Sequence, residues 1–162
     1  MYKILVFSLF CLMFNGLLAQ TPPYAIDPAA TKTQPSGLKI QIVQPGTGPN
    51  AKPGDIVEVH YYGTLTNGTM FDNSIDRGRP FKFKLGIGQV IRGWDEGIAL
   101  LNKGAKAILT IPAEMAYGAQ ERPTIPANSV LIFHVELVSI TEGPKPFVPY
   151  AYKESDLKTT PS

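Results

Sequence analysis

Apolar and polar residues alternate along several short stretches in the middle of the chain. Within residues 57–61, for example, valine and tyrosine alternate with glutamate and histidine. The stretches with this pattern are residues 57–65, 81–85, 105–111 and 131–137, together with a weaker run at 38–43. A period of two places the apolar side chains on one face of a strand and the polar ones on the other, which favours an antiparallel sheet. The pattern therefore predicts about five strands.

One segment has helical spacing instead. Ile91, Trp94, Ile98 and Leu101 recur every three or four residues, and Gly104 follows the run. An amphipathic helix has to bury its apolar side, and the single helix of this chain can do so only against the sheet. We therefore expect an α+β fold in which a twisted antiparallel sheet wraps around one short helix, with a further short turn at residues 112–117.

Both flanks of this region lack apolar periodicity and are rich in proline. Residues 21–36 contain four prolines, and residues 143–162 contain four more. Such stretches do not bury enough apolar surface to offset the entropy lost on ordering. The chain is thus expected to have a flexible linker at 21–36, one domain at 37–141 and a proline-rich tail at 142–162.

The first 20 residues are typical of a secretory signal peptide. Lys3 precedes an apolar run from Ile4 to Phe14, and Ala19 offers a small residue for cleavage before Gln20. The run is too short to span a membrane, although an uncleaved anchor remains the alternative. We expect an exported protein, periplasmic or secreted. Cys11 is the only cysteine, so the mature chain has no thiol or disulfide.

Charge and motifs exclude several function classes. The net charge is only +2 and no basic block is present, which argues against nucleic-acid binding. His60 and His134 fall on the expected outward faces of strands, where histidines are usually solvated rather than metal ligands. The glycines at 46–48 and 86–88 lack the helix and third glycine of a dinucleotide loop and are expected to form turns. Ser74, near Asp72 and His60, lacks the nucleophile elbow of a hydrolase.

Asn67 and Gly68 lie between two strand-like runs. An Asn-Gly pair in this setting is a strong signal for a β-hairpin turn. The sequence Asn67-Gly68-Thr69 also matches the acceptor pattern for N-glycosylation. We favour the hairpin because the turn alone explains these residues.

Aromatic residues are spread singly over the expected elements, each beside a short polar or glycine-containing segment. They are Tyr61, Phe71, Phe81, Phe83, Trp94, Tyr117 and Phe133. Aromatic rings supply rigid walls for an apolar pocket, and a neighbouring carboxylate or hydroxyl supplies a few polar contacts. The set suits a compact apolar ligand such as a proline ring, but spacing alone favours an ordinary core, because buried aromatic residues usually serve only to pack.

In these motifs the chain resembles the FKBP-type peptidyl-prolyl cis–trans isomerases. The resemblance covers about residues 37–140, in the order of the family and at nearly its spacing. The segments that carry it are Val59–Gly63, Asn67–Ser74, Pro80–Phe83, Leu85–Gly86, Gln89–Trp94, Ala116–Gly118, Ile125–Pro126, and Leu131–Phe133 leading into Val135–Leu137.

The resemblance implies a pocket between the helix and the sheet. Trp94 forms its floor, and the backbone N–H of Ile91 binds a carbonyl of the substrate. The implied apolar walls are Tyr61, Phe81, Val90, Ile91 and Phe133. The implied polar contacts are Asp72 and Tyr117. Further implied substrate-binding residues are Phe71, Arg77 and Ile125. The implied activity is isomerisation of X–Pro bonds in unfolded polypeptides, by a monomer that needs no cofactor or metal and is inhibited by macrolides such as rapamycin.

Three positions depart from the pattern of the family. The loop after Tyr117 is about one residue short, with Arg122 and Thr124 in place of other contacts, and Gln89 stands where an acid is common. These differences concern peptide preference more than activity. A non-catalytic chaperone or binding module for proline-containing segments is the alternative function.

The two proline-rich flanks share a short pattern. Residues 158–162 repeat the pattern of residues 32–36, which lead into the domain. Either the chain derives from a tandem array of such domains, or two linkers of low-information composition are alike by chance.

Overall fold

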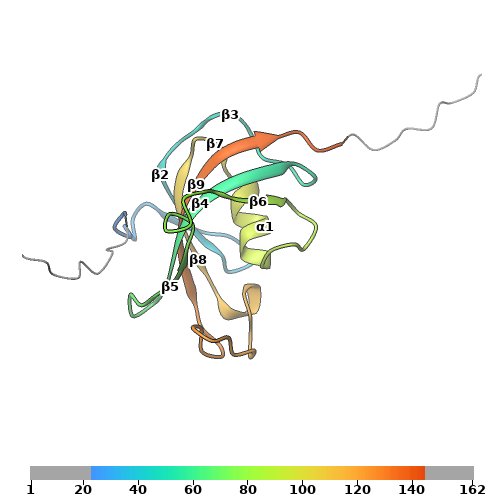
Figure 1. Cartoon of the computed structure of the whole chain (residues 1–162). Helices are drawn as coiled ribbons and strands as arrows, with labels where there is room; N and C mark the ends of the chain where they lie inside the picture. The colour runs from blue at the N-terminus through green and yellow to red at the C-terminus, as the bar shows by residue number, and fades with distance from the viewer. Residues whose placement is uncertain (1–22, 145–162) are drawn as a thin grey trace, which may run out of the picture.

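The computed structural model describes residues 23–144, and it confirms the expected α+β architecture. A seven-stranded antiparallel sheet curves around helix α1 (Arg92–Ala99), as Figure 1 shows. The expected signal segment, the residues of the tail beyond 144 and the repeated motif at 158–162 lie outside the described residues. Within residues 23–144, no helix has both the length and the apolar character needed to cross a bilayer.

Five strands of the sheet coincide with the alternating stretches of the sequence. They are β2 (Lys39–Gln44), β4 (Ile56–Leu65), β6 (Phe81–Lys84), β8 (Lys106–Ile111) and β9 (Leu131–Thr141). β1 (Thr31–Thr33) and β5 (Met70–Asn73) complete the order β1-β2-β8-β9-β4-β5, and β6 pairs with the first half of β4. A separate ribbon pairs β3 (Thr47–Asn50) with β7 (Asn102–Lys103), so part of the expected turn at 46–48 is a short strand.

The turn between β4 and β5 is the hairpin expected at Asn67-Gly68. The Gly68 N–H donates to the Leu65 carbonyl at 3.0 Å, and the Leu65 N–H donates to the Thr69 carbonyl at 2.9 Å. Gly68 has a φ of 83°, a left-handed conformation that favours glycine. The hairpin that the sequence favours is confirmed, and glycosylation of Asn67, the disfavoured alternative, is not tested by this turn.

The helix approaches the sheet closely because two glycines face it. A Cβ added to Gly93 would lie 2.4 Å from Cγ2 of Ile111, and one added to Gly97 would lie 2.8 Å from Cδ1 of Leu109. Both distances are too short for real carbon atoms, so only glycine permits this packing. α1 therefore lies directly on β8, and Trp94 beside Gly93 is held against the inner face of the sheet.

The N-terminal boundary of the domain lies earlier than the sequence indicates. β1 belongs to the expected flexible linker, yet it pairs with β2 from Thr31↔Gln41 to Thr33↔Lys39. Upstream of it, the side-chain amide of Gln41 accepts a bond from the Asp27 N–H at 2.8 Å and donates to the Ala25 carbonyl at 3.3 Å. All of these hydrogen bonds involve backbone groups, so the pattern of apolar residues could not predict them.

His134 is a second correction, because it is buried rather than solvated. It lies on the outer face of the sheet, the side opposite α1, but only 4% of it is exposed. The ring of Tyr24 covers it at a centroid distance of 6.2 Å. We call residues 23–30, which run along this outer face before β1, the N-terminal strap (Figure 1).

Candidate active site

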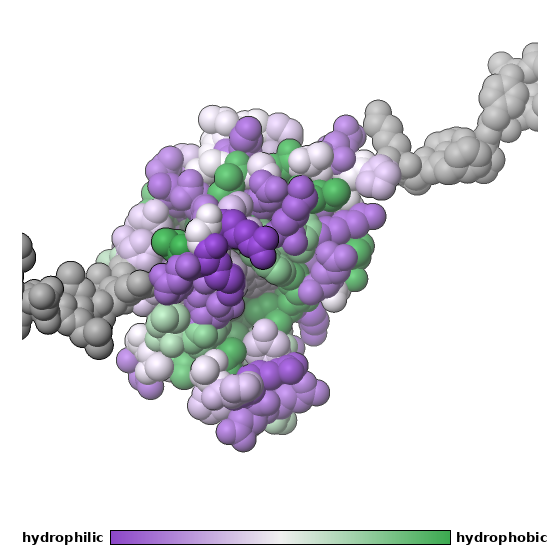
Figure 2. All heavy atoms as spheres, viewed as in Figure 1, coloured by the Kyte–Doolittle hydropathy of each residue, from purple (hydrophilic) through white to green (hydrophobic). Residues whose placement is uncertain are grey.

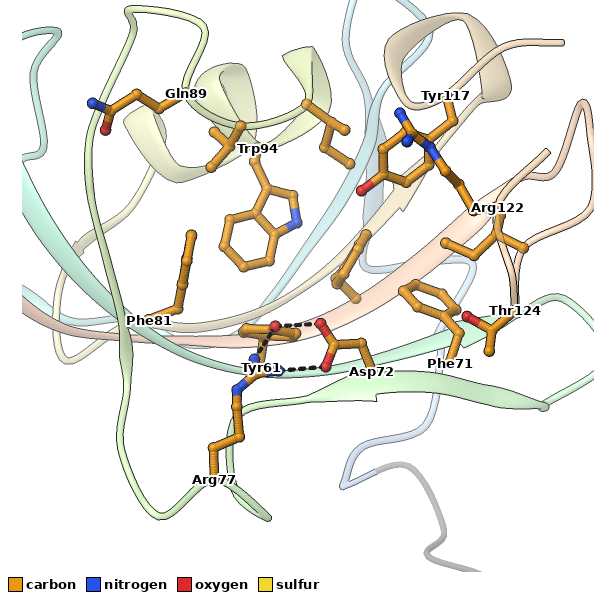
Figure 3. Close-up of a pocket in the computed structure, with 14 residues that line it drawn as sticks. Tyr61, Phe71, Asp72, Arg77, Phe81, Gln89, Trp94, Tyr117, Arg122 and Thr124 are labelled. Carbon is orange, nitrogen blue, oxygen red and sulfur yellow. Dashed lines mark hydrogen bonds and ion pairs between the residues drawn. The ribbon is translucent and has the colours of Figure 1, made fainter. Parts of the chain in front are cut away.

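A cleft of about 710 Å³ opens between α1 and the inner face of the sheet (Figure 3). Figure 2 shows hydrophobic residues in a hollow on this face, with hydrophilic residues around it. Every site residue that the resemblance implies lines the cleft, and so do the three departing positions. The lining residues are Tyr61, Phe71, Asp72, Arg77, Phe81, Gln89, Val90, Ile91, Trp94, Tyr117, Arg122, Thr124, Ile125 and Phe133.

Trp94 lies at the base of the cleft and is 4% exposed. Its ring meets Tyr61 edge-on at 5.0 Å and Phe133 at 5.2 Å, the perpendicular geometry that aromatic pairs favour. Phe83 packs against it at 5.7 Å, and the half-exposed Phe81 lies at 6.2 Å. The indole is thus fixed from several sides and offers a rigid apolar surface.

A bulge in the β4–β5 pair explains how two consecutive residues reach the same cleft. Asp72 pairs with Gly63 and Met70 pairs with Thr64, which leaves Phe71 as an extra residue. Successive side chains of a regular strand point to opposite faces, but a bulge redirects one of them. A Cβ on Gly63 would lie 2.7 Å from the ring of Phe71, so this glycine makes room for the ring.

Tyr61, Asp72 and Arg77 form a polar corner on one side of the cleft. The Tyr61 hydroxyl donates to Oδ2 of Asp72 at 2.5 Å, and Nη1 of Arg77 contacts Oδ1 at 2.7 Å. Nη2 of Arg77 donates to the Tyr61 oxygen. Burial, and then the hydrogen bond to Asp72, raise the pKa of Tyr61 to about 12. Tyr61 therefore keeps its proton at neutral pH and orients the carboxylate.

The loop before α1 is held by Asp95, a residue that the sequence did not single out. Its two carboxylate oxygens accept the N–H groups of Gly86 at 2.8 Å and Gly88 at 3.0 Å. The only sequence signal for Asp95 is that an acidic residue in the first turn of a helix is favourable there. The loop ends at Ile91, whose carbonyl begins the helix. Within the described part of the chain, the Ile91 N–H has no hydrogen-bond acceptor.

Tyr117 and Arg122 lie across the cleft from the polar corner (Figure 3). The guanidinium carbon of Arg122 is 4.8 Å from the centre of the Tyr117 ring. Among residues 23–144, no group forms a hydrogen bond with the Tyr117 hydroxyl, which leaves it available to a ligand. Ile125, 6% exposed, joins this side of the cleft to the core.

The hydrolase alternative loses support from the environment of Ser74. Its Oγ lies 3.0 Å from Nδ1 of His60, but Ser74 is fully buried and accepts the Tyr61 N–H at 2.8 Å. A nucleophile must reach its substrate, and this hydroxyl instead ties the backbone of β4 to the residues after β5.

Comparisons with known proteins agree with this geometry. The model of the FKBP-type peptidyl-prolyl cis-trans isomerase family matches residues 48–138. The chain is 51% identical over 112 residues to FK506-binding protein 1 of Candida glabrata, covering 68% of the chain and 98% of that protein. It is 40% identical over 156 residues to the peptidyl-prolyl cis-trans isomerase FKBP15-2 of Arabidopsis thaliana, covering 93% of the chain and 90% of that protein.

A solved structure has the same fold. The crystal structure of FkpA from Escherichia coli matches with a TM-score of 0.67 at 46% identity, over 71% of the chain and 53% of that structure. The family match spans more than half of the chain, and the relatives are matched over nearly their whole length. The chain therefore belongs to the FKBP-type peptidyl-prolyl cis–trans isomerases and shares their activity.

Proposed function

We propose that the cleft holds the proline ring of its substrate against Trp94 and accelerates rotation about the preceding peptide bond without a covalent step. The observation that carries this proposal is the arrangement of the cleft. A buried aromatic floor lies between the polar corner on one side and the Tyr117 hydroxyl on the other, and this hydroxyl has no partner among the described residues.

The physical requirement is modest. Rotation of an X–Pro bond crosses a barrier of roughly 18–20 kcal/mol, and uncatalysed exchange takes tens of seconds or longer. The twisted amide has lost its resonance and is less polar than the planar one. An apolar cleft therefore favours the twisted state, and hydrogen bonds that form only in that geometry lower the barrier further.

Each lining residue that the family resemblance implies has a proposed role in this scheme. Trp94 is the floor, and the Ile91 N–H donates to a substrate carbonyl. Asp72 and Tyr117 supply polar contacts, while Arg77 holds Asp72 in place. The proposed apolar walls are Tyr61, Phe71, Phe81, Val90, Ile91, Ile125 and Phe133.

We further propose that the substrates are unfolded exported polypeptides and that the protein acts as a monomer. The signal-like segment before residue 21 supports export, and slow proline steps limit the folding of such chains. A native protein that retained Met1 in mass spectrometry would contradict cleavage of a signal peptide, and with it a soluble exported form. The relative from Candida glabrata is named for binding FK506, which supports inhibition of this chain by macrolides such as rapamycin.

The decisive experiment measures exchange of an X–Pro peptide by NMR with catalytic amounts of purified protein. Acceleration that rapamycin abolishes supports the proposal. A folded protein that binds the peptide but leaves its exchange at the uncatalysed rate would instead be a binding module.

Substitution Asp72→Asn tests the polar corner. It keeps the shape of the side chain but removes the charge that Arg77 and Tyr61 contact, so we expect kcat/KM to fall about tenfold. Glu142→Gln, an exposed change beyond β9, is the matched control and should leave the rate unchanged. If Asp72→Asn abolishes the circular dichroism of the folded domain, Asp72 has a structural role and the assignment is wrong.

A further inference from the structure

Two arginines line the cleft, and they differ in their partners. Arg77 forms an ion pair with Asp72 at 2.7 Å. Arg122, on the opposite side of the cleft in Figure 3, forms no ion pair with any carboxylate among residues 23–144. Asp72 and the two arginines are the charged lining residues, so the lining carries one positive charge that no other lining residue balances.

Contacts within the chain hold Arg122 in a defined turn at the cleft. Its backbone N–H donates to the Ile125 carbonyl at 2.9 Å, and the Ile125 N–H donates back at 3.2 Å, closing a tight turn through Pro123. The guanidinium lies over the Tyr117 ring at 4.8 Å and donates from Nη2 to Oε1 of Gln120 at 3.3 Å. These neutral contacts leave its charge available to an anionic group.

We propose that Arg122 gives the isomerase a preference for substrates that carry Asp or Glu within about three residues of the proline. This inference rests on the proposed function of the cleft. An extended chain advances about 3.3–3.6 Å per residue, so a polypeptide with its proline at Trp94 brings flanking side chains to the rim. A carboxylate there matches the planar fork of a guanidinium, which binds it through two parallel hydrogen bonds.

The expected preference is modest because Arg122 is exposed to solvent. Ion pairs of this kind correspond to about a two- to fivefold change in kcat/KM. The preference should shrink at about 0.5 M sodium chloride, where the screening length is only a few ångströms. Salt dependence separates an effect of charge from one of shape.

The experiment uses pairs of X–Pro peptides that differ only by Glu or Gln at one position, scanned from three residues before the proline to three after it. NMR exchange gives kcat/KM for each peptide, and the readout is the Glu-to-Gln ratio. The variants are Arg122→Gln, which removes the charge, and Arg122→Lys, which keeps it. The control is Lys103→Gln, which makes the same change of net charge in β7. β7 lies beside Leu137, whereas the loop that carries Arg122 leads into the start of β9 at Leu131, so the two sites are far apart (Figure 1).

We expect a ratio of about two to five at one or two adjacent positions in the unaltered protein and in Lys103→Gln. The ratio should fall to about one in Arg122→Gln and stay above one in Arg122→Lys. A ratio of one in the unaltered protein, or an equal ratio in Arg122→Gln, overturns the inference while the acceleration of the Gln peptides keeps the proposed function intact. No acceleration of any peptide overturns the proposed function and this inference with it.

Discussion

The two faces of the sheet are covered in different ways. On the inner face, the cleft keeps the Tyr117 hydroxyl and the Ile91 N–H without partners among the described residues. On the outer face, one cross-strand row of buried residues runs from Gln41 to Asn73, and the strap meets it through Tyr24 and the bonds to Gln41. The same strands therefore present one face to a substrate and the other to the chain itself.

This difference predicts that changes on the inner face alter rate and stability together, whereas changes on the outer face alter stability alone. The row on the outer face follows the register of the sheet and consists of Gln41, Ile108, His134, Tyr62 and Asn73. None of these residues lines the cleft.

The largest effect is expected from Trp94→Ala. Removing the buried indole leaves a void under the cleft, which should lower the free energy of unfolding by about 3–5 kcal/mol and abolish measurable acceleration. Urea unfolding and NMR exchange measure the two quantities. Trp94→Phe should keep much of the stability and still lower the rate. An unaltered rate in Trp94→Phe would contradict the proposed role of the Trp94 indole as the floor of the cleft.

A variant that begins at Pro35 sharpens the comparison from the outer face. It lacks the strap and β1, and so loses the ring contact on His134 and the bonds to Gln41. We expect the free energy of unfolding to fall by about 2–4 kcal/mol. The rate of the folded fraction should not change, because no residue of the strap lines the cleft. Equal urea midpoints for the two proteins would mean that the strap contributes nothing to stability.

The two faces also differ in how far the sequence revealed them. The inner face could be predicted because core strands leave an alternating pattern and because the lining residues occur in recognisable motifs. The strap could not, because β1 pairs with β2 through backbone hydrogen bonds that any sequence can form. The side-chain amide of Gln41 binds the backbone of the strap, and nothing in the apolar pattern marks that contact. Phe71 and Asp72 both reach the cleft because of a bulge, and Arg122 stacks on the ring of Tyr117 because of a turn. Bulges and turns of this kind are features of backbone geometry that residue type does not reveal.

The smallest effect is expected from the titration of His134. Burial lowers its pKa from the ordinary value of 6.5, and Nδ1 has no partner among residues 23–144. The unfolded chain therefore takes up this proton at a higher pH than the folded chain. The stability associated with neutral His134 is present above about pH 6.5 and is lost as the pH falls toward the folded-state pKa.

Urea unfolding at about pH 7.5 and 5.5 measures this loss, which is at most about 1.4 kcal/mol for one histidine. The His134→Phe variant should not show this loss of stability at low pH, while the His60→Gln variant should still show it. The same pH dependence in His134→Phe and in the unaltered protein would show that another group is responsible. The rate on a neutral peptide should not follow the titration, because His134 is absent from the cleft.

The place of β9 in the sheet has a consequence for how the domain forms. It is the last strand of the described residues, yet it lies between β8 and β4 and pairs with both along most of its length. A nascent chain that ends before Leu131 has both halves of the sheet but not the strand that joins them. Because such long-range pairings form late and slowly, folding of this isomerase has to await completion of nearly its whole domain.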